Sequence, residues 1–292
     1  MSRARATGVG FLAILLWALL ALLTVATGAV PPFQLSAMCF AVGAAGGFAD
    51  MARRGAAPVA ALRQPARVWA LGVGGLFGYH FFYFTALRLA LAAEASLIAY
   101  LWPLLIVLFS GLLPGERLRW PHVAGAAAAF AGAALLVAPR LGGFSAGGAA
   151  GYAAAGVCAV TWAAYSVLSR RVGEAPTDAV AGFCLATAAL SLLAHLALET
   201  TAWPPDARGW LATLALGLGP VGAAFYFWDV GCKRGDIQLL GVAAYAAPLL
   251  STLALVASGA AEATPALLAA AALIAGGAAF AALASGAARK AA

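Results

Sequence analysis

SLIAYLWPLLIVLF, residues 96–109, is the stretch that decides the fold. It is apolar enough for one long helix, but Pro103 lies in its middle, where the ring removes a backbone N–H and clashes with the preceding turn. The second half of the chain repeats this arrangement in GVAAYAAPLLSTLAL, residues 241–255, where Pro248 again follows a tyrosine by three positions. The spacing predicts two matching kinked helices, with Pro103 and Pro248 as kink and gating residues.

The composition is that of a membrane protein. Hydrophobic residues make up 64% of the chain and charged residues 9%, and the mean hydropathy is +0.96, whereas about a quarter of an ordinary soluble domain is charged. Alanine and glycine dominate, which suits helices that approach one another closely in lipid. The apolar segments are continuous and about twenty residues long, so they predict all-α membrane spans rather than a closed barrel. The segments between them are too short for a soluble catalytic domain.

Charged, proline and glycine residues divide the chain into ten predicted spans of about the length that crosses a bilayer. The spans cover residues 8–26, 33–49, 68–89, 92–113, 123–138, 148–168, 179–198, 210–231, 237–258 and 265–284. The first also resembles a cleaved signal peptide, since a basic start precedes an apolar run with small residues near Ala29. We favour a span, because Trp17 within it has a counterpart, Trp162, deep in the chain.

Basic residues fall almost entirely into alternate connections between the spans. With the N-terminus inside, the inner segments contain Arg3, Arg5, Arg53, Arg54, Arg63, Arg67, Arg117, Arg119, Arg170, Arg171, Lys233, Arg234, Arg289 and Lys290, and the outer segments contain Arg88, Arg140 and Arg208. The positive-inside rule then predicts a multi-pass protein of a bacterial inner membrane with both termini cytoplasmic. The formal net charge of +7 reports this topology, so no nucleic-acid partner is needed to explain it.

A shift of 145 residues superposes the two halves of the sequence. It places Trp17 on Trp162, Pro31 on Pro176, Gly72 on Gly217, Arg88 on Lys233, Tyr100 on Tyr245 and Pro103 on Pro248. Because five spans is an odd number, the second half enters the membrane in the opposite sense, as in inverted-repeat transporters. We predict two five-helix repeats, residues 1–145 and 146–292. Some of the weaker matches are also expected from the alanine- and glycine-rich composition alone.

An inverted repeat indicates a substrate path between the halves that opens alternately to each side. At the kinks, the prolines would free the carbonyls of Ala99 and Ala244 from their usual partners at membrane depth. A cavity or a neighbouring helix can satisfy such groups. A proline kink can also serve packing alone, and the sequence leaves both interpretations open.

The block of residues 86–137 carries a family resemblance. It reads ALRLALAAEASLIAYLWPLLIVLFSGLLPGERLRWPHVAGAAAAFAGAALLV and has a partial echo from Val230 onward. The chain resembles the EamA-type branch of the drug/metabolite transporter superfamily and, within it, YddG-type aromatic amino-acid exporters. This resemblance implies ten helices, cytoplasmic termini and a central cavity between the halves. The second repeat departs from the pattern at Ala261-Glu262, where the first has Gly115-Glu116, so we assign no functional role to these glutamates.

Aromatic side chains gather in the spans that the repeat brings to the centre, where they could stack on a flat apolar solute while their polar atoms orient it. The predicted substrate-binding residues are Trp17, Tyr79, His80, Tyr83, Tyr100, Trp102, Trp162, Tyr165 and Tyr245. Aromatic residues also form belts at membrane interfaces. We favour a belt for those at the span ends, Trp69, Trp120, Trp203 and Trp210.

Three titratable residues are candidates for coupling transport to protons. His80 lies mid-span and titrates near neutrality, while Glu94 and Asp229 lie near span ends. Ordinary ion pairs, Glu94 with Arg88 and Asp229 with Lys233, explain the two carboxylates equally well, and a buried, hydrogen-bonded histidine explains His80. Proton-coupled antiport and facilitated diffusion are both open.

Other chemistry lacks a motif in this sequence. The four cysteines lie in apolar spans without metal-ligand or disulfide spacing, the histidines are scattered, and no nucleotide-binding fingerprint is present. We therefore predict no metal, no cofactor and no enzymatic activity. The predicted protein is an alternating-access carrier, functional as a monomer in the lipid bilayer, that exports aromatic and other neutral amino acids. The alternatives are an exporter of another metabolite or drug and an intramembrane enzyme.

Overall fold

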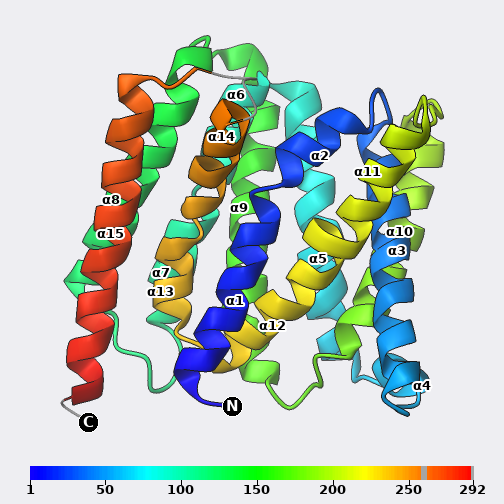
Figure 1. The fold of residues 1–292 in the computed structure, drawn as a ribbon, viewed down its shortest axis with the longest axis horizontal. Coiled ribbons are helices and arrows are strands. Elements are labelled where there is room, and N and C mark those ends of the chain that lie inside the picture. The colour runs from blue at the N-terminus through cyan, green and yellow to red at the C-terminus, as the bar shows by residue number, and fades with distance from the viewer. Residues whose placement is uncertain (258–261, 291–292) are drawn as a thin grey trace.

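The structure, a computed structural model, describes residues 1–257 and 262–290 and is all-helical in this part of the chain. Ten helical spans are long and apolar enough to cross a membrane, and they lie side by side in one bundle (Figure 1). The predicted ten-span, all-α fold is therefore confirmed. Residue 258, the last of the predicted ninth span, lies outside the described residues, as do residues 259–261 and 291–292 of the predicted second repeat.

Five spans make up the first half of the bundle. They are α1 (Arg3–Trp17) with α2 (Leu20–Ala26), α3 (Pro32–Arg53), α5 (Ala66–Leu89), α6 (Ala92–Ala99) with α7 (Trp102–Ser110), and α8 (Trp120–Val137), and the short α4 (Val59–Leu62) connects α3 to α5. A proline stands in the first turn of α3, α7 and α8. At that position the missing N–H would have no partner in the helix anyway.

The second half contains the other five spans, and the 3₁₀ turns η1 (Ala138–Arg140) and η2 (Ala146–Gly148) link it to the first. The spans are α9 (Ala149–Leu168) with η3 (Ser169–Val172), α10 (Ala179–Leu198), α11 (Ala207–Leu218) with α12 (Ala224–Arg234), α13 (Ile237–Ala243) with α14 (Ala246–Ala257), and α15 (Pro265–Lys290). A single π-helical turn, η4 (Gly219–Ala223), joins α11 to α12.

Corresponding helices of the two halves run in opposite directions. In Figure 1, α1 rises from the lower edge, α6 and α7 descend, and α13 and α14 ascend, while α1 begins and α15 ends at the lower edge. We call this edge the basic side, because Arg54, Arg119, Arg170 and Lys233 lie at helix ends there. The arrangement confirms the predicted inverted repeat; which side faces the cytoplasm stays a prediction.

Both proline-containing spans break at matching positions. The helix stops at Ala99 before α7 in the first half and at Ala243 before α14 in the second. The Tyr245 hydroxyl donates to the Tyr100 carbonyl at 3.0 Å and accepts the Leu104 N–H at 3.2 Å, so it stands between the two groups of one broken helical hydrogen bond. Ordered polar groups of this kind are what a kink at membrane depth requires.

At the second kink the Ala244 carbonyl lacks its usual helical partner, because residue 248 is a proline without an N–H. The Ala244 carbonyl is not left without a partner, because it accepts the N–H of Ala247 at 3.1 Å. A tighter, 3₁₀-type bond therefore replaces the usual one. The gating role of Pro103 and Pro248 stays a prediction.

Helices α8 and α15 touch backbone to backbone through small residues. A Cβ atom on Gly125 would lie 2.5 Å from the Gly277 carbonyl oxygen, and one on Gly132 would lie 2.9 Å from that of Ala270. Residues 125 and 270, like 132 and 277, differ by the same 145 positions that relate the halves. The contact is thus self-complementary, as at a two-fold interface, and it places the pseudo-two-fold axis between these helices.

Candidate functional site

Four tryptophans from four helices meet at the centre of the bundle. Trp17 of α1 lies with its ring centroid 5.0 Å from that of Trp228 of α12, 5.8 Å from that of Trp162 of α9 and 6.1 Å from that of Trp102 of α7. Phe225 of α12 joins them, 6.2 Å from Trp17 and 5.7 Å from Trp162. We call these five residues the central aromatic cluster; each half of the chain contributes to it.

Trp17 and Trp162 are the pair that the 145-residue shift relates, and their rings are in contact. Residues related by a two-fold axis can touch each other only close to that axis, so the cluster lies where the two halves meet. Hydrogen bonds fix two of its members. The Trp17 indole N–H donates to the Pro220 carbonyl at 3.1 Å, and that of Trp228 donates to the Ser166 hydroxyl at 3.0 Å.

Helix α5 carries the predicted residues Tyr79, His80 and Tyr83 alongside this cluster. The Tyr79 ring lies 5.2 Å from the Trp162 ring and is stacked on Tyr83 at 6.0 Å with an interplanar angle of 9°. The His80 Nδ1–H donates to the Leu76 carbonyl at 2.7 Å. This bond fixes the ring orientation and leaves Nε2 as the free ring nitrogen of the neutral form.

The predicted substrate-binding residues separate into two groups by exposure. Half-buried are Trp17, Tyr79, His80, Tyr83 and Tyr100; buried are Trp102, Trp162, Tyr165 and Tyr245. The first group keeps some accessible surface, whereas the second group is enclosed by other side chains. Both assignments as substrate-binding stay predictions.

Tyr245 lies apart from the other predicted residues. Its ring contacts Phe130 at 6.1 Å, within the apolar core that α8, α14 and α15 share, and its hydroxyl is taken up by the first kink. The structure adds Trp228, which the sequence-based list omitted. A signal for it was present, because Trp228 is related by the same shift to Tyr83, and Phe225 to His80.

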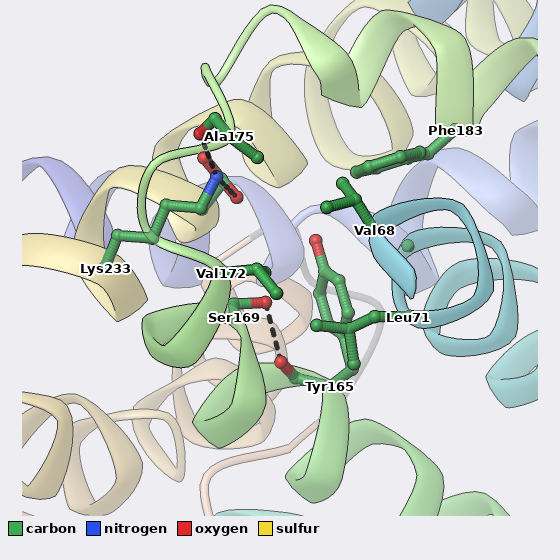
Figure 2. A pocket seen from close by; sticks show the side chains of 10 residues that line it. Val68, Leu71, Tyr165, Ser169, Val172, Ala175, Phe183 and Lys233 are labelled. Carbon is green, nitrogen blue, oxygen red and sulfur yellow. Dashed lines mark hydrogen bonds and ion pairs between the residues drawn. The ribbon is translucent and has the colours of Figure 1, made fainter. Parts of the chain in front are cut away.

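A narrow pocket lies next to Tyr165, on the basic side of the central aromatic cluster (Figure 2). The Tyr165 ring is 5.1 Å from that of Trp162. Helix α5 of the first half and α9, η3, α10, α12 and the segment between η3 and α10 of the second provide the lining residues, which are Val68, Leu71, Gly72, Tyr165, Ser169, Val172, Ala175, Phe183, Asp229 and Lys233. The pocket has room for about one water molecule.

Glycines on α5 let large rings reach this place. A Cβ on Gly75 would lie 2.4 Å from the Tyr165 ring, and one on Gly72 would lie 2.5 Å from the Phe183 ring. Because real Cβ atoms do not approach other atoms so closely, glycine is required at both positions. The two rings therefore stand where they do because α5 lacks side chains there.

The three candidate coupling residues have defined partners. Asp229 pairs with Lys233 at 2.8 Å, as their spacing predicts. Glu94 does not pair with Arg88, so that expectation was wrong: the Glu94 carboxylate accepts the Tyr152 hydroxyl at 2.5 Å, and Arg88 donates to the Leu198 carbonyl at 3.2 Å. The Glu94 partner lies on α9, far along the sequence, where helix spacing could not indicate it.

Ion pairs close the bundle on the basic side. Glu116, in the segment between α7 and α8, accepts from Arg3 of α1 at 3.1 Å and from Arg170 of η3. Arg170 also donates to the carbonyls of Cys232 at 2.9 Å and Gly235 at 2.5 Å. One arginine thus joins a segment of the first half to two segments of the second.

Metal binding has no site in the described part of the chain, where no three His, Cys, Asp or Glu residues are grouped to hold an ion. Cys39, Cys158, Cys184 and Cys232 are all buried free thiols. The site thus consists of stacking surfaces, indole and phenol groups, and a buried ion pair. Such groups can bind and orient a solute, but they do not assemble a nucleophile with a base.

Several known proteins resemble this chain, one of them over nearly its whole length. An aromatic amino acid exporter YddG from Ancylobacter novellus is 60% identical over 261 residues, which are 89% of this chain and 90% of that protein. Proteins of the same name from Salmonella typhimurium and Escherichia coli K12 are each 26% identical over 172 residues, 55% of this chain and 57% of theirs.

The fold is also found in a solved structure, and a family model matches both halves. A crystal structure with 59% sequence identity superposes with a TM-score of 0.92 and covers 97% of this chain and 99% of that one. The EamA-like transporter family model matches residues 5–138 and again residues 149–283. The chain therefore belongs to the EamA-like transporter family and is a transporter rather than an enzyme.

Proposed function

We propose that the protein is an alternating-access carrier that exports aromatic amino acids, together with other neutral amino acids, from the cytoplasm. The observation that carries the proposal is the central aromatic cluster at the meeting point of two inverted halves. The exporter from Ancylobacter novellus, at 60% identity, supports the choice of aromatic amino acids.

The chemistry of the cluster suits a flat apolar side chain. Offset or edge-on contact between aromatic rings stabilises a pair by about 0.5–1.5 kcal/mol beyond burial. Trp17 and Tyr79 are half-buried and contact the buried Trp162, and Tyr83 stacks on Tyr79, so a substrate ring could replace part of their mutual contact. The indole N–H and phenol groups add polar atoms to orient it.

Orientation and assembly follow from the sequence as proposals. The basic side faces the cytoplasm of a bacterial inner membrane, because cytoplasmic connections retain lysine and arginine. One chain acts alone, because a single copy supplies both halves of the cluster.

Alternating access requires that the closed basic side open. In the described state, Glu116 and Arg170 join the halves there, and separating them exposes the interior to the cytoplasm. The Arg170 and Glu116 side chains are 19% and 9% exposed, so both charges must gain water or new partners when the halves separate. His80, Glu94 and Asp229 are candidates for coupling this step to protons, and facilitated diffusion needs none of them.

Counterflow in proteoliposomes tests the function. We expect purified protein to move labelled tryptophan across the bilayer with saturation and counterflow, since a carrier shows both. Trp17→Ala should lower transport about tenfold by removing ring contacts, without loss of the folded bundle. The same assay under an imposed pH gradient distinguishes proton coupling from facilitated diffusion.

Trp203→Ala is the matched control, because Trp203 is 61% exposed and stacks on Trp210 far from the cluster. Its transport should equal that of the wild type. Vesicles no more permeable to tryptophan or phenylalanine than protein-free vesicles would contradict the substrate assignment. Saturable transport of another metabolite, unaffected by aromatic amino acids, would instead favour a different exporter of the same family.

A further inference from the structure

The pocket beside Tyr165 contains a buried pair of opposite charges. The Asp229 side chain is 2% exposed and that of Lys233 7%, and taking two charges out of water costs several kcal/mol for each ion before their attraction is counted. Ion pairs at helix ends are ordinarily exposed to water, so their charges carry no desolvation cost. A buried pair facing a pocket therefore needs a reason.

The pair retains capacity to bind a further group. The Lys233 ammonium donates to Asp229 and to the Ala175 carbonyl at 2.9 Å, and it has three N–H bonds. Asp229 accepts from Lys233 on one oxygen and from the Thr177 hydroxyl at 2.8 Å on the other. Each carboxylate oxygen can accept two hydrogen bonds. In the described contacts, one N–H of Lys233 and two acceptor positions of Asp229 thus remain unused.

Tyr165 supplies a second, independent observation. Its side chain is 3% exposed, and its hydroxyl has no hydrogen-bond partner in the described part of the chain. A buried polar group without a partner costs about 1–3 kcal/mol. Figure 2 shows this hydroxyl pointing into the pocket beside Val68 and Phe183, with Lys233 on another wall. The group is held ready for a ligand rather than for the protein.

We propose that this pocket binds the head group of a zwitterionic α-amino acid, with Asp229 receiving its ammonium and Lys233 and Tyr165 its carboxylate. The inference rests on the proposed function and extends it. The central aromatic cluster binds the substrate ring, and the pocket binds its charged groups. Its position on the basic side, one turn of α9 from Trp162, places it between that side and the cluster.

The size of the pocket fits a site that fills only when the basic side opens. As described it admits about one water molecule. Its Phe183 ring packs on Gly72 of the opposite half, so movement of the halves changes the space directly. Water would occupy the polar groups until the head group of a substrate replaces it.

Competition by three indoles against labelled tryptophan counterflow tests the proposal. Tryptophan carries both charged groups, tryptamine lacks the carboxylate and indole-3-propionate lacks the ammonium. We expect Lys233→Met to reduce the advantage of tryptophan over tryptamine about tenfold, the effect of one hydrogen bond to a charged group. The advantage over indole-3-propionate should stay. Asp229→Asn should reduce the advantage of tryptophan over indole-3-propionate and leave its advantage over tryptamine unchanged.

Arg234→Met is the matched control, since it removes the same charge from the exposed neighbouring position outside the pocket; its ratios should equal those of the wild type. Tyr165→Phe deletes one oxygen and keeps the ring, so it decides the matter if Lys233→Met does not fold: the tryptamine ratio should fall about fivefold. Unchanged ratios, or equal losses for all three indoles, overturn the proposal. If the wild type shows no tryptophan counterflow, the proposed function itself fails and the pocket assignment falls with it.

Discussion

The two halves of the molecule agree in several contacts across the pseudo-two-fold axis and differ in where their helices are interrupted. Trp17 and Trp162 touch, and α8 and α15 meet through matched small residues. By contrast, the first span breaks between α1 and α2 while α9 is continuous, and α5 is continuous where η4 interrupts the eighth span. Both interruptions adjoin Trp17, whose indole N–H bonds to Pro220 of η4, so the halves have diverged in backbone even where their side chains still meet.

The two kinks show the same divergence on a smaller scale. The Tyr245 hydroxyl bridges the Tyr100 carbonyl and the Leu104 N–H of the first kink, while the second kink closes with its own backbone. Tyr100 is half-buried and Tyr245 is buried. The Tyr245 side chain is therefore part of the framework, whereas the Tyr100 side chain keeps some accessible surface.

The ends of the bundle differ most. Arg170, which closes the basic side, corresponds under the 145-residue shift to Val25, which is 80% exposed. The arginine that joins the halves on the basic side is therefore replaced by an apolar residue at the corresponding position on the opposite side. The opposite side must therefore close by different contacts.

We expect the largest loss of stability from adding a side chain to α5 where it packs against α9. Gly75→Ala would place a Cβ 2.4 Å from the buried Tyr165 ring, and overpacking of this kind destabilises by about 1–3 kcal/mol. Gly74→Ala meets nothing within 4 Å and should not destabilise. Thermal unfolding in detergent measures both. Equal unfolding temperatures would show that α5 can move away from α9.

A smaller effect should separate the two kink tyrosines. Tyr245→Phe removes the hydroxyl between Tyr100 and Leu104 and leaves backbone groups without that partner, so we expect a loss of about 1–2 kcal/mol. Tyr100→Phe keeps its half-buried ring and should leave the unfolding temperature unchanged. If Tyr100→Phe is the more destabilising variant, the halves have divided these roles in the opposite way.

The smallest effect concerns the closed basic side and is best measured kinetically. Arg170→Met loses the contacts to Glu116, Cys232 and Gly235, so maleimide labelling of the buried Cys232, mapped by mass spectrometry, should accelerate about tenfold, the equivalent of one hydrogen bond to a charged group. Arg171→Met is the control, because Arg171 bonds to the Leu112 carbonyl and not to Glu116. Identical labelling rates would mean that Arg170 does not hold this side closed.

The fold could be predicted because lipid constrains it strongly. Span length, the distribution of basic residues and the 145-residue shift each follow from chain order alone. The break after Trp17 could not be placed in this way, whereas Pro220 is a signal for the one at η4. The first has no proline or glycine, and the Trp17 indole N–H instead reaches the Pro220 carbonyl of a distant helix.

The site could be predicted only in part, for a related reason. Helix spacing gathered the aromatic residues of α5 and α9 and paired Asp229 with Lys233. It could not find the pairing of Glu94 with Tyr152 or of Glu116 with Arg170, because each joins elements whose approach depends on the packed bundle. Nor could it show that Tyr245 serves the backbone.

The glycine seam between α8 and α15 limits how such a molecule can move. Where two backbones are in direct contact, no side chain lies between them that could change rotamer as the helices slide. At the Gly72–Phe183 and Gly75–Tyr165 contacts, by contrast, an aromatic ring lies between the halves. The α8–α15 edge thus acts as a rigid spine. Rearrangement of one half against the other must concentrate away from this edge, for example where α5 meets α9 and α10.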